Sequence, residues 1–207
     1  MIGIVDYGVG NLFSVQNSLT FLGAQSCLVS QPDQLEAVDA LLLPGVGAFR
    51  DAMARLVDSG LVEAIRAQAQ KKPLLGICLG MQLLFDHGYE FGDTPGLGLI
   101  SGSVSKIDAG GQKLPHMGWN ELRVVHPSPL SKGVSDGDYV YFVHSYCAST
   151  DDRYLCLDTQ YGQRIPALVQ NGMVYGAQFH PEKSAATGLQ ILRNFAELSS
   201  EKMGVTI

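Results

Sequence analysis

The chain has 207 residues, of which 46% are hydrophobic and 16% are charged, and its formal net charge at pH 7 is −6. This composition is typical of a globular protein, and a chain of this length can bury about 70% of the surface that it exposes when unfolded. The acidic balance, with no basic run longer than Lys71-Lys72, argues against nucleic acid or an anionic membrane as a partner. We therefore expect one soluble domain over residues 1–207.

The start of the chain and its cysteines predict a reducing, cytoplasmic location. The first residues, MIGIVDYG, lack the positive n-region of a signal peptide and include an acid at position 6. No apolar run approaches the ~18 residues that a membrane-spanning helix needs. The four cysteines lie far apart and form no C-x-x-C pair, so we expect neither a zinc site nor a disulfide framework.

Strand and helix patterns alternate through the first part of the chain. Strands are predicted over residues 2–5, 26–30 and 40–43, and helices over residues 12–22, 32–37, 50–57 and 61–70. This alternation predicts a mostly parallel sheet with helices on both faces, whose site lies at the carboxyl ends of the strands. Gly8-x-Gly10 is similar to a dinucleotide loop, but Phe13 occupies the position of the third glycine, so we expect no such cofactor.

The loop Pro44-Gly45-Val46-Gly47 follows the third predicted strand directly. Its two glycines would allow backbone N–H groups to turn toward a bound oxygen. Taken alone, the loop is explained more simply as an ordinary turn before the next helix. Beside a thiol nucleophile, an oxyanion-binding strand becomes the favoured interpretation.

Such a nucleophile is predicted in the next stretch, residues 73–85, where a buried strand changes into a helix predicted over residues 79–85. Cys78 lies between them in Gly76-x-Cys78-x-Gly80, the spacing of a nucleophile elbow with sulfur in place of a hydroxyl. The chain crosses itself at such a turn, and a side chain two positions before or after the nucleophile would clash. The helix N-terminus would favour the thiolate. A buried structural cysteine is the alternative, and the two glycines argue against it.

Beyond residue 85 the pattern changes to short alternating segments. Residues 87–98 predict an exposed loop, and residues 103–107, 121–125 and 139–145 predict antiparallel strands that extend the main sheet or flank it. Trp119 lies in a predicted turn flanked by Pro and Gly, where it could serve local packing or anchor a partner. The expected fold is thus α/β, a mostly parallel open sheet with helices on both faces and a smaller antiparallel side sheet.

A further predicted strand, over residues 173–179, ends at His180-Pro181-Glu182. Period-two spacing would place His180 and Glu182 on the same side of an extended segment, so that the carboxylate could orient the imidazole. A histidine held in this way could accept the proton of Cys78 and later donate it to a leaving amine. Considered singly, a capped strand end and a solvated acid are the simpler explanations. Four other histidines are weaker candidates, two in polar loops and two with no acid nearby in sequence: His87, His126, His116 and His144.

Together these motifs resemble the class I (triad) glutamine amidotransferases. The resemblance covers the whole chain and depends most on GICLGMQ at residues 76–82 and HPE at residues 180–182. Within that class, the segments IVDYGVGNL, PGVGAF, PHMGWN, YFVHSY and HPEKS resemble the glutaminase subunits of imidazole glycerol phosphate synthases. The resemblance implies a flavodoxin-like core and release of ammonia from L-glutamine, without a metal or cofactor.

The resemblance also implies a role for individual residues. Cys78 would attack the glutamine carboxamide, His180 would be acid and base, and Glu182 would orient His180. The implied oxyanion hole uses the backbone at Val46, Gly47 and Leu79. The implied glutamine contacts are Gln82, Glu90, Ser145 and Tyr146, and the implied partner-facing positions are Asn11, Trp119, Tyr141 and Lys183.

The implied partner is a (β/α)₈-barrel cyclase subunit, which would form a heterodimer with this chain and receive its ammonia. The products would be imidazole glycerol phosphate and an aminoimidazole-carboxamide ribonucleotide, in histidine biosynthesis, and glutaminase activity would be weak until the partner binds its ligand. One alternative is a triad glutaminase of another synthase, such as one for anthranilate, aminodeoxychorismate or pyridoxal phosphate; PHMGWN weighs against it. The other is a non-catalytic regulatory subunit, against which the intact Cys78, His180 and Glu182 argue.

Overall fold

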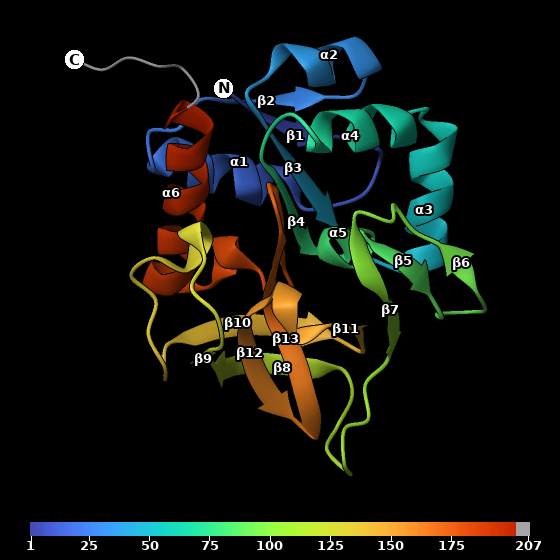
Figure 1. Cartoon of the computed structure of the whole chain (residues 1–207), viewed down its shortest axis with the longest axis vertical. Helices are drawn as coiled ribbons and strands as arrows, with labels where there is room; N and C mark the ends of the chain where they lie inside the picture. Colours follow the sequence, from blue (N-terminus) through green and yellow to red (C-terminus); the bar gives the residue numbers. More distant parts are fainter. Residues whose placement is uncertain (202–207) are drawn as a thin grey trace.

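The chain folds around one large sheet, which runs from β1, β2 and β3 in the upper half of Figure 1 to β9, β12 and β13 in the lower half. The computed structural model describes residues 1–201, and among these the main sheet has eight strands in the order β2-β1-β3-β4-β14-β13-β12-β9. The strands from β2 to β14 pair in parallel, and the remaining three continue the sheet in antiparallel fashion. The predicted mostly parallel sheet with an antiparallel extension is thereby confirmed. The strand bounds are β1 Ile2–Val5, β2 Ser26–Val29, β3 Ala40–Gly45, β4 Leu74–Cys78, β9 Arg123–Val124, β12 Leu155–Tyr161, β13 Gln163–Asn171 and β14 Val174–Ala177.

Helices cover both faces of the parallel part, as the alternating pattern predicts. In Figure 1, α1 and α6 lie on one side of β1, β3 and β4, and α2, α3 and α4 lie on the other. The helix bounds are α1 Leu12–Phe21, α2 Pro32–Ala37, α3 Phe49–Asp58, α4 Val62–Ala69, α5 Leu79–Gln82 and α6 Ala185–Glu201. Three short 3₁₀ helices are described as well, at Pro129–Ser131, Asp152–Tyr154 and Pro181–Lys183.

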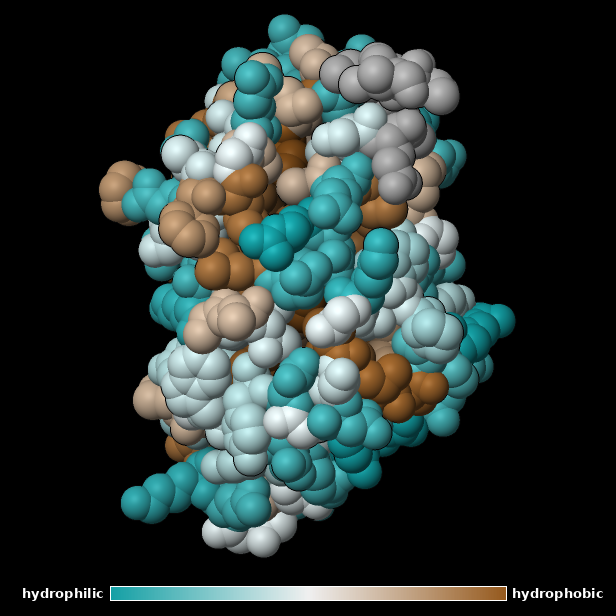
Figure 2. Space-filling view, turned by 90° about the vertical axis from the view of Figure 1, so that its left-hand side faces the viewer, coloured by the Kyte–Doolittle hydropathy of each residue, from teal (hydrophilic) through white to brown (hydrophobic). Residues whose placement is uncertain are grey.

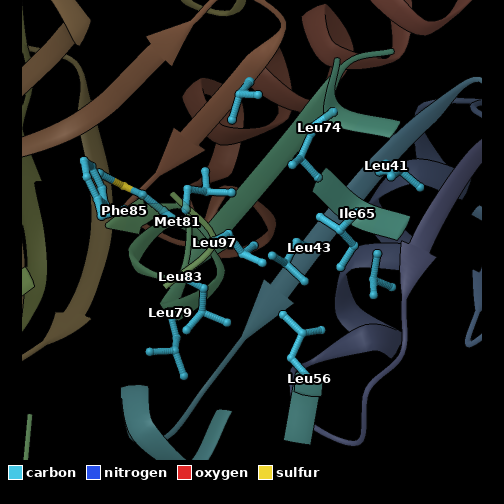
Figure 3. Close-up of a cluster of buried hydrophobic side chains, with 14 of the residues drawn as sticks. Leu41, Leu43, Leu56, Ile65, Leu74, Leu79, Met81, Leu83, Phe85 and Leu97 are labelled. Atoms are coloured by element: carbon cyan, nitrogen blue, oxygen red, sulfur yellow. The ribbon is translucent and has the colours of Figure 1, made fainter. Parts of the chain in front are cut away.

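The two helical layers rest on opposite faces of the same strands. In β3, Leu41 and Leu43 join one buried cluster with Leu56 of α3, drawn in Figure 3. The intervening Leu42 joins a second cluster with Leu19 of α1. Successive side chains of a strand point to opposite faces, so a strand with helices on both sides must be apolar throughout. This is why residues 40–43 form a continuous apolar run rather than an alternating one.

Two smaller sheets flank the main one: in Figure 1, β8 and β10 lie beside β12 and β13, and β5, β6, β7 and β11 lie on the right. The first pairs β8 (His116–Glu121) with β10 (Tyr139–His144) in antiparallel fashion. The second has the order β11-β7-β5-β6. Its strands are β5 Phe85–Gly88, β6 Thr94–Pro95, β7 Ile100–Lys106 and β11 Tyr146–Thr150. The predicted side sheet is therefore present.

The helix predicted over residues 79–85 is too long, because α5 ends at Gln82 and Phe85 begins a strand. The backbone after α5 finds partners elsewhere: the carbonyl group of Leu83 accepts from the N–H of Leu97, and that of Leu84 from the N–H of Leu99, both at 2.8 Å. Tertiary hydrogen bonds thus override the helical spacing of the apolar residues. The loop predicted over residues 87–98 likewise contains the end of β5 and all of β6.

The turn predicted around Trp119 is also wrong, because residues 116–121 form strand β8. Pairing with β10 places Trp119 directly opposite Tyr141 and His116 opposite His144. Side chains that alternate between buried and accessible positions along β8 fit one covered and one open face.

The molecular surface seen in Figure 2 mixes apolar and hydrophilic side chains. On this face the apolar atoms form separate groups divided by hydrophilic ones, without one large apolar patch. Among the described residues, none of the helices combines the length and the apolar character that a membrane crossing requires.

Candidate active site

Cys78 ends strand β4 on the predicted sharp turn into α5. Its backbone has φ 54° and ψ −111°, a left-handed conformation that is costly for a residue with a β-carbon. The two glycines are needed for steric reasons: a β-carbon at Gly76 would lie 2.6 Å from the carbonyl oxygen of Gly80, and one at Gly80 would lie 1.8 Å from that of Leu43. The elbow therefore holds the thiol at the carboxyl end of β4, against the neighbouring strand.

His180 follows β14, the strand that pairs with β4 on its other side. Its Nδ1 lies 2.8 Å from Oε1 of Glu182, and both side chains are almost fully buried. The contact that the sequence predicts is present, but the predicted extended segment is wrong, because residues 181–183 form a 3₁₀ turn that starts at His180. The hydroxyl group of Ser184 holds this turn by donating to the carbonyl group of His180 at 2.7 Å.

The electrostatic surroundings of His180 favour its charged form. Burial by itself lowers the pKa of this imidazole, but its hydrogen bonds with Cys78 and Glu182 and their charges outweigh burial and raise the pKa to about 9. Since the carboxylate binds Nδ1, Nε2 is the ring nitrogen left for the sulfur atom. This is the arrangement of a nucleophile, a base and a group that orients the base.

The predicted oxyanion loop lies beside Cys78. Strand β3 continues through Gly45, which pairs in register with Cys78. Val46 then becomes 44% exposed, and Gly47 has a φ of 95° with no atom within 4 Å of the place where a β-carbon would be. The loop is therefore anchored at Gly45, while Gly47 retains the room and the backbone freedom to turn.

Tyr7, in the segment that follows β1, anchors this loop, a contact that the sequence motifs do not indicate. Its hydroxyl group donates to the carbonyl oxygen of Pro44 at 2.9 Å. Burial, followed by the nearby charge of Cys78, raises the pKa of Tyr7 above its ordinary value, so the phenol stays a neutral donor. The carbonyl group at the base of the loop is thereby fixed.

A cavity of about 420 Å³ opens in front of Cys78. All the residues predicted for the triad's nucleophile and base, the oxyanion hole and the glutamine contacts line it: Cys78, His180, Val46, Gly47, Leu79, Gln82, Glu90, Ser145 and Tyr146. Val143, His144 and Lys183 line it too. Glu182 stands behind His180 rather than in the cavity wall. The residues come from three strand ends and from the side sheets, and the fold brings them together around one space.

Two of the predicted glutamine contacts are tied into the wall by their own hydrogen bonds. Nε2 of Gln82 donates to the carbonyl oxygen of Tyr146 at 2.9 Å and to Oε1 of Gln178 at 3.0 Å. Oε2 of Glu90 accepts from the N–H of Phe49 at 2.9 Å, at the first turn of α3. Sequence reasoning did not identify Gln178, because its place beside Gln82 depends on the pairing of β14 with β4 and no local pattern signals it.

Three of the four predicted partner-facing residues lie near one another, and one of them, Lys183, lines the cavity. Trp119 is 52% exposed, and its ring meets that of Tyr141 edge-on with 6.2 Å between centroids. Lys183 belongs to the 3₁₀ turn after His180, and the amide N–H of His180 donates to the carbonyl group of Tyr141. Asn11 caps helix α1, where its side chain accepts from the N–H of Ser14 at 3.3 Å. Trp119, Tyr141 and Lys183 are therefore neighbours, whereas Asn11 has a structural contact of its own.

The remaining cysteines and the possible metal ligands lie apart from one another within residues 1–201. Across residues 1–201 there is no group of three or more His, Cys, Asp or Glu side chains that could hold a metal ion. The four cysteines are free, and burial raises the pKa of both Cys147 and Cys156 to about 11, which leaves them as inert thiols.

Comparison with known proteins places this geometry in a family. The model of the family "Glutamine amidotransferase class-I" matches residues 3–198. The chain is 47% identical over 200 residues to the imidazole glycerol phosphate synthase subunit HisH of Caldanaerobacter subterraneus subsp. tengcongensis, covering 96% of this chain and 98% of that protein. It is 49% identical over 209 residues to the subunit HisH of Geobacillus sp. (strain WCH70), covering 98% and 99%.

Solved structures with low sequence identity share the fold. A glutamine amidotransferase crystal structure superposes with a TM-score of 0.75 at 21% identity, covering 96% of this chain and 98% of that one. The structure of PurLQS from Thermotoga maritima gives a TM-score of 0.75 at 20% identity, covering 95% and 97%. These two structures confirm the predicted fold.

Proposed function

This chain belongs to the class-I glutamine amidotransferase family, and from that premise we propose that it is the glutaminase subunit of an imidazole glycerol phosphate synthase. Its reaction is the hydrolysis of L-glutamine to glutamate and ammonia, in the service of histidine biosynthesis. The observation that carries the reaction is the placement of Cys78 and the buried His180–Glu182 pair at one end of a cavity large enough for an amino acid. The near full-length relatives named HisH support the choice of synthase.

In the first half of the reaction the sulfur atom of Cys78 attacks the side-chain carboxamide carbon of glutamine. His180, which holds the thiol proton, donates it to the leaving nitrogen, so ammonia departs and a glutamyl thioester remains. Glu182 keeps the imidazole oriented and stabilises its charged form. Water then attacks the thioester with His180 as base, which releases glutamate and restores the free Cys78.

The negative oxygen that forms in each half needs donors close to Cys78. The backbone N–H of Leu79, at the start of α5, and an N–H of the Val46–Gly47 loop are the proposed pair. One such donor lowers the barrier by about 3–4 kcal/mol. The open space and positive φ at Gly47 suit a loop that must present its N–H group to the oxygen.

Glutamine itself would be held by residues that line the cavity. Glu90 supplies a charge opposite to that of the substrate ammonium group, and Gln82 with the backbone at Ser145 and Tyr146 completes the wall. The ammonia would pass to a (β/α)₈-barrel cyclase subunit that docks over Trp119, Tyr141 and Lys183, with Asn11 at the margin. Cytoplasmic location follows from this biosynthetic role and is part of the proposal.

Glutamate release from glutamine is the first measurement, with the chain alone, with the cyclase subunit, and with that subunit and its nucleotide ligand. We expect weak release from the chain alone and a large rise in the third condition. Strong release from the chain alone would keep the thiol chemistry but contradict dependence on the partner. No release under any condition would favour a regulatory subunit or a different synthase partner.

The variant Cys78→Ser separates catalysis from structure. It should abolish glutamine-dependent synthesis by the complex while leaving synthesis from added ammonia intact, because the cyclase reaction needs the nitrogen and not the thiol. Loss of both activities would show that Cys78 is needed for the fold or for docking. The variant Cys27→Ser, at a half-buried cysteine of β2 far along the sheet order from β4, is the matched control.

A further inference from the structure

Two buried histidines face each other at the end of the β8–β10 ribbon, beside the cavity. His116 and His144 are cross-strand partners, and 3% and 6% of their surfaces are exposed. Nδ1 of His116 lies 3.0 Å from Nε2 of His144. His144 also lines the cavity that contains Cys78. The reaction described above uses neither ring.

The hydrogen bonds of His144 determine which of its nitrogens carries the proton. Nδ1 lies 2.8 Å from the carbonyl oxygen of Tyr146, and because a carbonyl group can only accept, Nδ1 is the donor. Burial lowers the pKa of His144 to about 4, so the ring is neutral at pH 7. A neutral ring has one N–H, and Nε2 is therefore an acceptor.

The same reasoning extends to His116. Since Nε2 of His144 accepts, Nδ1 of His116 must donate, and burial also lowers the pKa of His116 to about 4. Its Nε2 then accepts from Nδ2 of Asn120 at 3.3 Å. The amide of Asn120 is oriented independently, because its Oδ1 accepts from the N–H of Glu121 at 2.9 Å. The hydrogen bonds thus run in one direction, from Asn120 through both rings to Tyr146.

Packing fixes the His116 ring as firmly as its hydrogen bonds do. It stacks on Tyr161 with 4.0 Å between centroids and on Phe142 with 4.8 Å. A ring held between two aromatic side chains cannot rotate to offer its other nitrogen without displacing them. The donor that reaches His144 is therefore preset by the strands.

The series of hydrogen bonds ends at the wall that would hold the substrate. The carbonyl oxygen of Tyr146 accepts from Nδ1 of His144 on one side and from Nε2 of Gln82 on the other. Ser145 and Tyr146 both line the cavity. This short connection between β10 and β11 has its backbone fixed from two directions.

We propose that His144 and His116 are positioning residues, which hold the Ser145–Tyr146 wall in the geometry that binds glutamine. This inference rests on the proposed glutaminase function. His144 acts through the carbonyl group of Tyr146, and His116 acts through His144 by donating to its Nε2, which holds the ring with Nδ1 toward that carbonyl group. A wall that is rigid before the substrate arrives lowers the cost of binding, so the pair affects KM more than kcat.

The protonation pattern can be read by NMR of the full chain with ¹⁵N-labelled histidine. At neutral pH both rings should give the signature of a neutral imidazole protonated on Nδ1. The variant His116→Phe keeps a ring between Tyr161 and Phe142 but removes the donor to Nε2 of His144. The ¹⁵N resonance of that Nε2 should therefore shift, while Nδ1 stays protonated toward the carbonyl group of Tyr146. Nε2 protonation or a charged ring at His144 in the wild-type chain would overturn the proposal.

Kinetics of glutamate release, with the cyclase subunit present, test the consequence for binding. His144→Leu should raise the KM for glutamine about tenfold with a smaller change in kcat, which corresponds to the net worth of one hydrogen bond. His144→Asn places an amide donor where Nδ1 was and should restore most of the lost affinity. His126→Gln, at an exposed histidine outside this network, is the control and should change nothing.

Two results would overturn the positioning role: an unchanged KM in His144→Leu, or the same KM in the leucine and asparagine variants. If the wild-type complex released no glutamate, the proposed function would be overturned instead. The NMR test does not depend on that function. If the wild-type complex releases glutamate but the two histidine rings are not neutral and protonated on Nδ1, only the positioning role is overturned.

Discussion

The left-handed backbone conformation of Cys78 is strained, and its neighbours hold it in place. A non-glycine residue in such a conformation costs of order 1–3 kcal/mol, and it persists where the surroundings leave no alternative. Here the surroundings are the strand that precedes Cys78 and the backbone of Leu43, which approaches Gly80 so closely that no side chain fits between them. The thiol is thus held in front of the cavity by contacts of backbone on backbone.

Replacing Gly80 by alanine should therefore destabilise the fold severely. The new β-carbon would meet the carbonyl oxygen of Leu43 at 1.8 Å, and separating β3 from α5 to relieve the clash should cost about 3 kcal/mol or more. Urea denaturation would give the free energy of unfolding. The matched control is Gly60→Ala, where φ is 71° and the space is open, so that only about 1 kcal/mol of backbone strain is expected. Equal losses in the two variants would contradict the steric explanation.

Glu182→Gln tests the electrostatics of the His180 pair. In the wild-type chain the pKa of His180 is raised to about 9, so the alkaline limb of kcat/KM should lie near that pH. Without the carboxylate the charged imidazole loses a stabilising partner, and the limb should move to lower pH. The pH dependence of glutamate release measures this shift.

The same raised pKa links protonation of His180 to stability. The fold stabilises the protonated form, so the contribution is fully present below the ordinary histidine pKa of about 6.5 and is lost as pH rises through about 9. The wild-type free energy of unfolding should thus fall toward that of Glu182→Gln between these two values. Glu36→Gln, at an exposed acid of α2, should leave both profiles unchanged.

At the scale of elements, three adjacent strand ends build the site. β3 leads into the oxyanion loop, β4 ends at Cys78 and β14 leads to His180, and these strands are neighbours in the sheet. The side sheets then close the cavity on the side of Ser145 and Tyr146. An element outside the main sheet can therefore alter substrate binding without touching the nucleophile.

Helix α3 gives one test of such an element. Its N-cap residue, Ala48, offers no side-chain acceptor, and the carboxylate of Glu90 accepts from Phe49 instead. Glu90→Ala should lower the free energy of unfolding by about 1 kcal/mol, the usual worth of a helix cap. Glu90→Gln retains an oxygen acceptor and should retain much of that stability.

The two Glu90 variants should behave alike toward glutamine. Both remove the charge that is proposed to face the substrate ammonium group, so both should raise KM in the glutaminase assay. An unchanged KM in Glu90→Gln would show that Glu90 serves α3 alone. A loss of stability in Glu90→Gln as large as in Glu90→Ala would instead attribute the cap to charge rather than to the hydrogen bond.

What the sequence predicted well are features that a short segment determines by itself. The elbow needs Gly76 and Gly80 at fixed spacing around Cys78, and the buried strands can be recognised as apolar runs. The hydrogen bond from Tyr7 to Pro44 and the contact between His116 and His144 depend on which strands become neighbours, and no local sequence pattern carries that information. The helix after Cys78 was predicted too long for the same reason. The carbonyl groups of residues 83 and 84 accept from the N–H groups of residues 97 and 99, which are distant in the sequence, instead of continuing the helix.

At the scale of the whole molecule, the proposed docking surface and the cavity share one edge. Trp119 and Tyr141 stand on the β8–β10 ribbon, and Lys183 both flanks them and lines the cavity. A partner seated on this edge would cover the mouth of the cavity. Ammonia leaving Cys78 would then meet the partner before bulk water.

Trp119→Ala should weaken binding of the cyclase subunit. A half-exposed tryptophan that a partner buries is typical of a residue whose removal costs at least about 2 kcal/mol, which corresponds to roughly a thirtyfold rise in Kd. Titration calorimetry of the two subunits would measure it. Val57→Ala, at an exposed apolar residue of α3, is the control, and an equal effect there would contradict the proposed surface.

The position of β14 in the sheet has a consequence for the order in which a ribosome makes this protein. Within residues 1–201, β14 is the last strand along the chain, yet it lies between β4 and β13. Until residue 177 has left the ribosome, β4 can carry Cys78 but has one unpaired edge, of the kind that attracts other chains. His180 arrives three residues later. The nascent chain therefore completes the Cys78–His180 site at almost the same point at which it covers this edge of β4, and chains that end before that point should be both inactive and prone to aggregation.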